Sequence, residues 1–263
     1  MSKPERFIGI HLAGANSHKT CLVVLAPQDD FFEIDRIHNH LGPKTSMSSD
    51  DRIEKILKTL SHNASVVVDA PLSVPPCTRC TRQSCPGVSY CDDTAIACLL
   101  YLDSKRGNSR KRPCNPQVHR LWDLFHNHEI QDHSSRSSLV TRARTLQKRL
   151  RNFDIPVSET SILDSIQFVP NCDYKRYRHF QEGIATRKKI VLYLEKWTRE
   201  GFQQKKQFIE SIELFHALIC AWIAFLHSQK QTLPVPNNFP KEESFPLIPP
   251  QNLVPPQERF KTF

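Results

Sequence analysis

The stretch VVVDAPLSVPPCTRC (residues 66–80) combines an apolar run, an acid at its end, a proline-rich turn and a close pair of cysteines. The run Val66-Val67-Val68 is typical of a strand buried on both faces, because β-branched side chains pack well inside a sheet. Asp69 then falls at the carboxyl end of that strand, where ligands collect in open α/β sheets. The prolines that follow continue neither a strand nor a helix. Asp69 is therefore either a turn residue or part of a functional site.

The segments before and after this strand predict an α/β fold. Three apolar runs joined by short turns predict an antiparallel meander of strands over residues 6–14, 19–27 and 31–40. A helix follows, with Asp51 and Glu54 as its expected capping box, and it leads into the Val66 strand. Later helices are expected over residues 92–105, 115–128, 138–153, 174–199 and 206–228, with a short strand over 155–160. The sum is a mixed sheet flanked by helices.

Length and composition indicate one domain over residues 1–233 and a proline-rich tail over 234–263, which either lies on the domain or stays mobile. No run approaches the ~20 apolar residues of a membrane span. The N-terminal MSKPERFIGI lacks the pattern of an export signal, so we expect a cytoplasmic protein. In that reducing compartment the nine cysteines are expected to be thiols or metal ligands.

Four of these cysteines lie in one short loop, CTRCTRQSCPGVSYC, within residues 75–92. Cys77 and Cys80 form a CxxC pair, and Cys85 and Cys91 complete the tetrahedral set that a structural zinc ion requires. An iron–sulfur cluster uses the same four thiolates and stays an alternative, as do buried thiols without a metal. Cys98 and Cys114 lie near this loop in the sequence and are candidates to replace one of the four ligands.

The net charge of +9 is concentrated in two stretches, of which the basic helical region over residues 105–153 is the longer. A basic face of this kind attracts a polyanion through charge steering and counterion release, so we expect nucleic acid as a partner. The alternative is a set of solvated helix faces. The residues expected to contact phosphates are Arg142, Arg144, Lys148, Arg149 and Arg151.

Four motifs together resemble an uncharacterised family described as predicted ribonuclease H-like nucleases. They are FIGIHLAG (residues 7–14), VVVDAPLSVP (66–75), VSET (157–160) and HALICAWIA (216–224). In that family the first motif reads GIDLAG, the second IDAPLS, and the last helix begins with Asp-Ala. The resemblance implies a ribonuclease H-like mixed sheet, with the cysteine loop as an insertion.

The same resemblance implies phosphodiester cleavage by metal ions held between carboxylates. Asp69 and Glu159 match acidic positions of the family, whereas His11 and His216 stand where the family has Asp. Mg²⁺ prefers oxygen ligands, so an altered site of this kind is expected to favour Mn²⁺, Fe²⁺ or Zn²⁺. Glu213, one turn before His216, is an additional candidate carboxylate.

Three functions follow from these residues. The first is a metal-dependent nuclease or other phosphoesterase that uses His11, Asp69, Glu159 and His216 as its catalytic set. The second is a domain that has lost catalysis, with both histidines merely hydrogen-bonded, and that still binds nucleic acid. The third is an interaction protein stabilised by its cysteine–metal loop.

Overall fold

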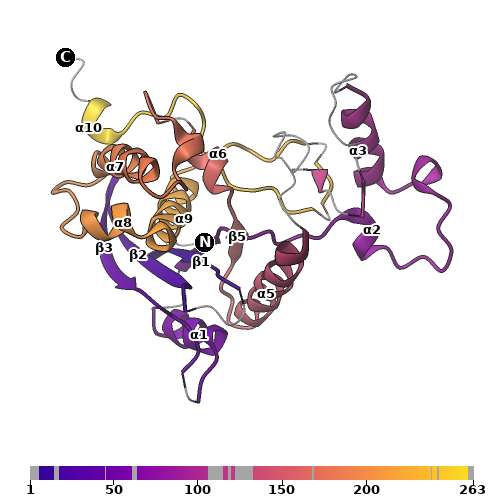
Figure 1. Cartoon of the computed structure of the whole chain (residues 1–263), viewed down its shortest axis with the longest axis horizontal. Helices are drawn as coiled ribbons and strands as arrows, with labels where there is room; N and C mark the ends of the chain where they lie inside the picture. The colour runs from indigo at the N-terminus through magenta and orange to yellow at the C-terminus, as the bar shows by residue number, and fades with distance from the viewer. Residues whose placement is uncertain are drawn as a thin grey trace.

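The computed structural model of the chain describes residues 6–14, 18–44, 46–60, 64–105, 115–117, 120–121, 133–167, 169–237, 239–241 and 243–259 (Figure 1). Most of the helix expected over residues 115–128 lies outside these ranges, as does Cys114. No helix in the described ranges combines the length and the apolar character that crossing a membrane requires.

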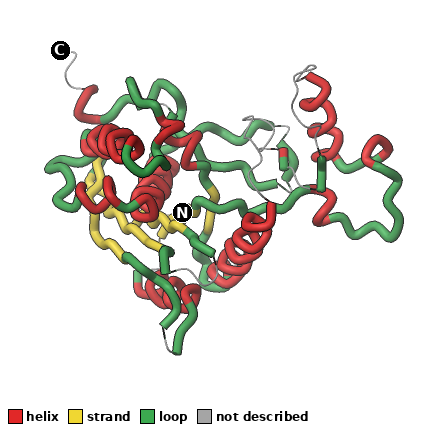
Figure 2. The backbone as a smooth tube through the Cα atoms, in the orientation of Figure 1, coloured by secondary structure: helices red, strands yellow, loops and turns green. Residues whose placement is uncertain are grey.

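The centre of the fold is a five-stranded sheet in the order β3-β2-β1-β4-β5 (Figure 2, yellow). Its strands are β1 (Arg6–His11), β2 (Cys21–Gln28), β3 (Phe31–His38), β4 (Ala64–Val68) and β5 (Val157–Glu159). The first three pair antiparallel, and β4 and β5 join β1 in parallel. The predicted mixed α/β sheet is thereby confirmed. The carboxyl ends of β1, β4 and β5 lie at one edge of the sheet.

The alternation of side chains along each strand divides the core into two layers. One face of the sheet, which includes Phe7 and Val67, packs against helix α9 (Ile212–Ser228). The other face, which includes Ile8 and Val68, packs against α1 (Ser49–Thr59) and α5 (His133–Arg151). Helix α9 is buried nearly all round, because α7 (Glu182–Glu195) and α8 (Lys205–Glu210) pack against its other side (Figure 1).

Gly9 lets β1 and α9 approach unusually closely. A Cβ atom at Gly9 would lie 1.9 Å from the carbonyl oxygen of Ala217 and 2.2 Å from the nitrogen of Ala221. Only a residue without a side chain fits here, and small residues on the helix leave room for the strand. His11 follows Gly9 on the same face of the strand, so the close approach brings it to the start of α9.

Shorter elements surround this core. They are α2 (Pro76–Arg79), η1 (Val88–Tyr90), α3 (Thr94–Lys105), α6 (Ile162–Ile166), η2 (Tyr174–Arg176) and α10 (Pro256–Arg259). Figure 1 shows α2, α3 and the loop between them projecting away from the sheet. The cap of α1 differs from the expected Asp51–Glu54 box, because the helix begins one turn earlier. Ser48 is the N-cap, and Asp51 completes the box with it.

The described part of the proline-rich tail lies on the domain. The amide of Leu247 donates to the carbonyl oxygen of Glu159 at 2.8 Å, and the Thr160 hydroxyl donates to the carbonyl of Leu247 at 2.6 Å. Leu247 and Ile248 are buried. The tail thus adds its backbone beside the end of β5, which is an edge strand of the sheet.

Candidate metal centre

The carboxyl ends of β1 and β4 place a histidine and an acid side by side. His11 is the last residue of β1, and Asp69 directly follows β4. The amide of Asp69 donates to the carbonyl of Ile10 at 3.4 Å, which continues the parallel pairing by one residue. The amide of Leu12 donates to Asp69 Oδ1 at 3.1 Å. The backbone therefore fixes one oxygen of Asp69 and leaves Oδ2 for the site.

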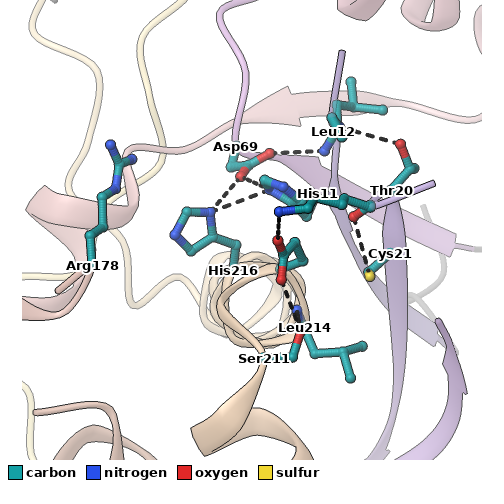
Figure 3. A network of polar contacts seen from close by, with 12 residues as sticks. His11, Leu12, Thr20, Cys21, Asp69, Arg178, Ser211, Leu214 and His216 are labelled. Atoms are coloured by element: carbon teal, nitrogen blue, oxygen red, sulfur yellow. Dashed lines mark hydrogen bonds and ion pairs between the residues drawn. The ribbon is translucent and has the colours of Figure 1, made fainter. Parts of the chain in front are cut away.

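Helix α9 contributes the third residue of the site. Its N-cap Ser211 accepts a hydrogen bond from the amide of Leu214, and this start positions His216 toward the sheet. His216 Nδ1 lies 3.0 Å from Asp69 Oδ2 and 3.3 Å from His11 Nδ1, and His11 Nδ1 lies 2.5 Å from the same oxygen. Figure 3 shows both imidazole rings turned toward Asp69. In the described part of the chain this is the one group of at least three potential metal ligands that converges.

The protonation states of the three groups depend on one another. Burial alone would raise the pKa of Asp69, but His11 and His216 outweigh it and hold that pKa well below its ordinary range. Burial alone would lower the pKa of His11, but the Asp69 carboxylate outweighs it and raises that pKa. Burial dominates at His216 and lowers its pKa against the pull of Asp69. In the metal-free site Asp69 is therefore held ionised, while His11 is shifted toward its protonated form and His216 toward its neutral form.

The ligand atoms nearly fit a metal ion. Four-coordinate zinc with bonds of about 2.0–2.1 Å separates its ligand atoms by roughly 3.3–3.4 Å. The two distances from His216 Nδ1, 3.3 Å and 3.0 Å, are close to this value. The 2.5 Å contact between His11 and Asp69 is shorter, as expected for a hydrogen-bonded ion pair. An ion would replace the shared proton, and the distance between these two atoms would increase from 2.5 Å by somewhat less than about 1 Å.

A second observation concerns the other nitrogen of the His216 ring, which does not face Asp69. His216 Nε2 is buried and has no hydrogen-bond partner among the described residues. The His216 side chain is 7% exposed. Buried polar atoms are rarely left unpaired, and those that are tend to mark functional sites or bound ions and water. One ring nitrogen of His216 is thus hydrogen-bonded to Asp69, and the other has no partner among the described residues.

Glu159 does not join the group, although the sequence places it in the same catalytic set. Val68 pairs with Glu159 across β4 and β5, so these two residues point to the same face of the sheet, and Asp69 points to the other. The Glu159 carboxylate accepts from Arg120 Nη1 at 2.9 Å and from the amide of Leu72 at 2.6 Å. Its side chain is 2% exposed. A contribution of Glu159 to catalysis stays a prediction, without support from its position.

Glu213 also stays outside the group. Its carboxylate is 3.2 Å from Lys19 Nζ and accepts from the Ser211 hydroxyl at 3.1 Å. It lies close enough to favour the charged form of His11. Glu213 therefore lies beside the site, where it contributes negative charge but is not placed to coordinate an ion.

The five basic residues expected to bind phosphates fall into two sets on α5. The prediction is wrong for Arg142, which is buried and makes structural contacts. Its guanidinium contacts Asp50, Ser49, Thr20 and the carbonyl of Ala13. Arg149 is half-buried and pairs with Asp51 and Glu54. The remaining residues, Arg144, Lys148 and Arg151, are exposed at spacings of four and three, so they share one face of the helix.

The four loop cysteines lie in one region without converging as a ligand group. Cys77 lies in α2, Cys80 directly follows it, and Cys91 directly follows η1. Burial and the charges of the other three thiolates raise the pKa of Cys77, so the four groups are near enough to interact. All four are free thiols. A cysteine–metal site therefore stays a prediction that requires the loop to close further.

Some residues around the site had no signal in the sequence. Arg120 lies far from Glu159 along the chain, and nothing in its local sequence indicates that it neutralises a buried acid. Glu243 of the tail accepts from the amide of Leu121 at 2.8 Å, an equally long-range contact. Tyr177 and Arg178, which border His216, belong to the run YKRYRH, whose mixture of basic and aromatic residues was the only indication.

Comparisons with protein-family models, with curated proteins and with solved structures find no match for this chain. The functional interpretation therefore depends on the chain's own residues. Its firmest element is the convergence of His11, Asp69 and His216, three residues widely separated in the sequence.

Proposed function

We propose that the chain is a metal-dependent hydrolase of phosphate esters, with nucleic acid as its substrate class and an altered ribonuclease H-like site. The observation that carries the proposal is the convergence of one carboxylate oxygen and two imidazole nitrogens at the edge of the sheet. An ion bound there would supply Lewis acidity toward a phosphoryl group and toward water.

The arrangement of elements supports the ribonuclease H-like part of the proposal. Three of the four motifs that carry the resemblance meet where the family pattern implies a site: His11 ends β1, Asp69 follows β4, and His216 lies in the first turns of α9. The antiparallel meander followed by two parallel strands is also what the resemblance implies.

The donor set favours particular ions. Two nitrogen donors and one carboxylate suit Mn²⁺, Fe²⁺ or Zn²⁺ better than Mg²⁺, which selects oxygen and has a single protein carboxylate here. Asp69 orients His11 and stays ionised, and a neutral His216 can present a lone pair at Nδ1 once its proton lies on Nε2. Uptake of an ion would release the proton that His11 shares with Asp69.

Metal titration of the purified protein tests the centre. We expect Zn²⁺ or Mn²⁺ to bind with proton release, and Asp69→Ala or His216→Ala to weaken binding at least 100-fold, since removal of a first ligand costs more than the 10–100-fold typical of an outer partner. The matched control is His227→Ala, which removes an exposed histidine from the same helix. Equal metal affinity in all variants would contradict the proposed metal centre and therefore the proposed hydrolase activity.

A nucleic-acid-binding domain without catalysis is the second candidate, favoured by the exposed face of α5. Binding that depends on Arg144, Lys148 and Arg151 should weaken with a slope of roughly −2 to −3 in log K against log salt. The triple alanine variant should abolish that slope, while Lys188→Ala on α7 should leave it unchanged. Binding without any cleavage in Mn²⁺ or Zn²⁺ would favour this candidate over the hydrolase.

We further propose a structural zinc ion held by Cys77, Cys80, Cys85 and Cys91. The support is the close spacing of the four thiols and their mutual electrostatic influence. Thiolate ligands also suit the cytoplasmic location that the sequence predicts. Elemental analysis should show zinc that is lost in Cys77→Ser and kept in Cys172→Ser. Iron with matching sulfide would instead assign an iron–sulfur cluster to the same residues.

A further inference from the structure

We propose that Arg178, oriented by Tyr177 beside the His11–Asp69–His216 group, binds the phosphoryl oxygens of the substrate. This inference deepens the proposed function and depends on it for the substrate class. In Figure 3, Arg178 extends from the neighbouring loop on the side of His216 that faces away from His11. The observations behind the proposal concern how Tyr177 is fixed, what it does to Arg178, and which atoms of Arg178 stay available.

Tyr177 is packed firmly against the metal-binding helix. Its ring centroid lies 5.6 Å from that of His216 and 5.8 Å from that of Phe215, and the residue is 1% exposed. Its carbonyl oxygen accepts from Arg187 Nη1 at 2.5 Å. Arg187 is itself buried and donates through Nε to the carbonyl of Ile209 at 2.7 Å. A buried cation thus anchors the backbone that precedes Arg178.

A close approach of α7 also fixes this backbone. A Cβ atom at Gly183 would lie 2.6 Å from the carbonyl oxygen of Tyr177 and 3.0 Å from that of Arg176. The first turn of α7 therefore packs directly on the loop, and a larger residue at position 183 would displace it. The loop that carries Arg178 is held on two sides, which is expected of a residue that must be positioned in advance.

Tyr177 orients the guanidinium of Arg178. The Tyr177 hydroxyl accepts from Arg178 Nε at 2.8 Å, and the guanidinium carbon lies 5.4 Å from the ring centroid. Burial raises the pKa of Tyr177 to about 12, so the phenol stays neutral and leaves the charge of Arg178 uncompensated. Nη1 and Nη2 have no hydrogen-bond partner or ion pair with any described residue, and Arg178 is exposed. A guanidinium whose terminal nitrogens are both available suits bidentate binding of a phosphoryl group.

The electric field of Arg178 reaches the metal ligands. Its charge is close enough to act on both His11 and His216, where it is weaker than the influence of Asp69. A divalent ion with two neutral imidazoles and one carboxylate carries a net charge of about +1. The site would then have two positive groups: the ion on the side of His216 that faces His11, and the Arg178 guanidinium on the other side. This pattern suits a phosphate ester, whose charge is spread over several oxygens.

The test is calorimetric titration of inorganic phosphate and of acetate into Zn²⁺-loaded protein. We compare Arg178→Ala, Arg178→Lys and Tyr177→Phe with Arg176→Ala. The last is a matched control, because Arg176 lies in the same exposed loop but pairs with Asp173 and Glu182. We expect Arg178→Ala to weaken phosphate binding about 10–100-fold, the range for hydrogen bonds to charged groups. Arg178→Lys should recover part of this loss, and Tyr177→Phe should cause a smaller one.

The outcome separates this inference from the proposed function. Zn²⁺ affinity should be the same in all four variants, because none removes a ligand of the ion. Equal phosphate affinity in Arg178→Ala and Arg176→Ala would overturn the inference, and so would acetate binding as tight as phosphate binding. If the protein takes up no Zn²⁺, the proposed function fails, and the phosphate titration is repeated on the metal-free protein. A loss specific to Arg178 would then still support the anion site, and its absence would overturn it.

Discussion

Asp69 and Glu159 are two buried acids at the same edge of the same sheet, and their surroundings differ completely. Asp69 faces α9 and meets two histidines, one of which keeps an unpaired nitrogen. Glu159 faces the opposite side and meets Arg120 and a backbone amide. The first acid shares its charge with groups that change protonation or bind an ion. The second is neutralised by a permanent cation.

The difference shows that the surroundings of a strand-end acid depend on the face of the sheet on which it lies. Because side chains alternate, moving one residue along the chain exchanges the two environments. The α9 face offers imidazoles, and the other face offers a guanidinium. A buried acid with a permanent partner stabilises the fold, whereas one with titratable partners is available for chemistry.

The largest expected effect on stability comes from removing the permanent partner. Arg120→Ala leaves the carboxylate of Glu159 buried and unpaired, which should lower the free energy of unfolding by about 3–5 kcal/mol. Urea unfolding of the metal-free protein measures this. Arg151→Ala, an exposed control, should change stability by less than about 0.5 kcal/mol. Similar results for the two variants would show that Glu159 is not neutralised by Arg120 as described.

Asp69→Asn should cost less stability while abolishing metal uptake by the His11–Asp69–His216 group. The asparagine oxygen still accepts from the amide of Leu12, and His11 loses its proton once the carboxylate is gone, so no buried charge stays unpaired. We expect a loss of about 1–2 kcal/mol in the metal-free protein. A loss as large as that of Arg120→Ala would contradict the distinction between the two acids.

The smallest effect should come from an exposed acid, Asp51, which caps α1 and pairs with Arg149. Hydrogen bonds from Ser48 and Arg149 lower the pKa of Asp51 from 3.8 to about 2. Since the folded state binds the proton less tightly, the stabilisation is complete above pH 3.8 and is lost as the pH falls toward 2. Acid unfolding of Asp51→Asn and of the unchanged protein should therefore differ above pH 4 and converge near pH 2. A constant difference would assign the effect to something other than the charge.

Local sequence predicted the sheet and the elements that carry the three converging residues. The run before Asp69 specifies a buried strand whatever the rest of the chain does, and it is confirmed as β4. The single helix expected over residues 206–228 is divided at Ser211 into α8 and α9, and its apolar periodicity is confirmed over α9. Spacing alone could not show that Glu159 faces away from Asp69, because that depends on the register between β4 and β5. The burial of Arg142 was equally invisible, since its acid partner Asp50 lies on another helix.

The contact between Leu247 and Glu159 has a consequence for the order in which the protein is made. During synthesis β5 emerges long before residue 247, so the contact between them forms only after the residues that lie between them have been made. Open strand edges are where unfinished chains join one another. A nascent chain that lacks residue 247 therefore leaves the end of β5 without the partner that the folded protein gives it.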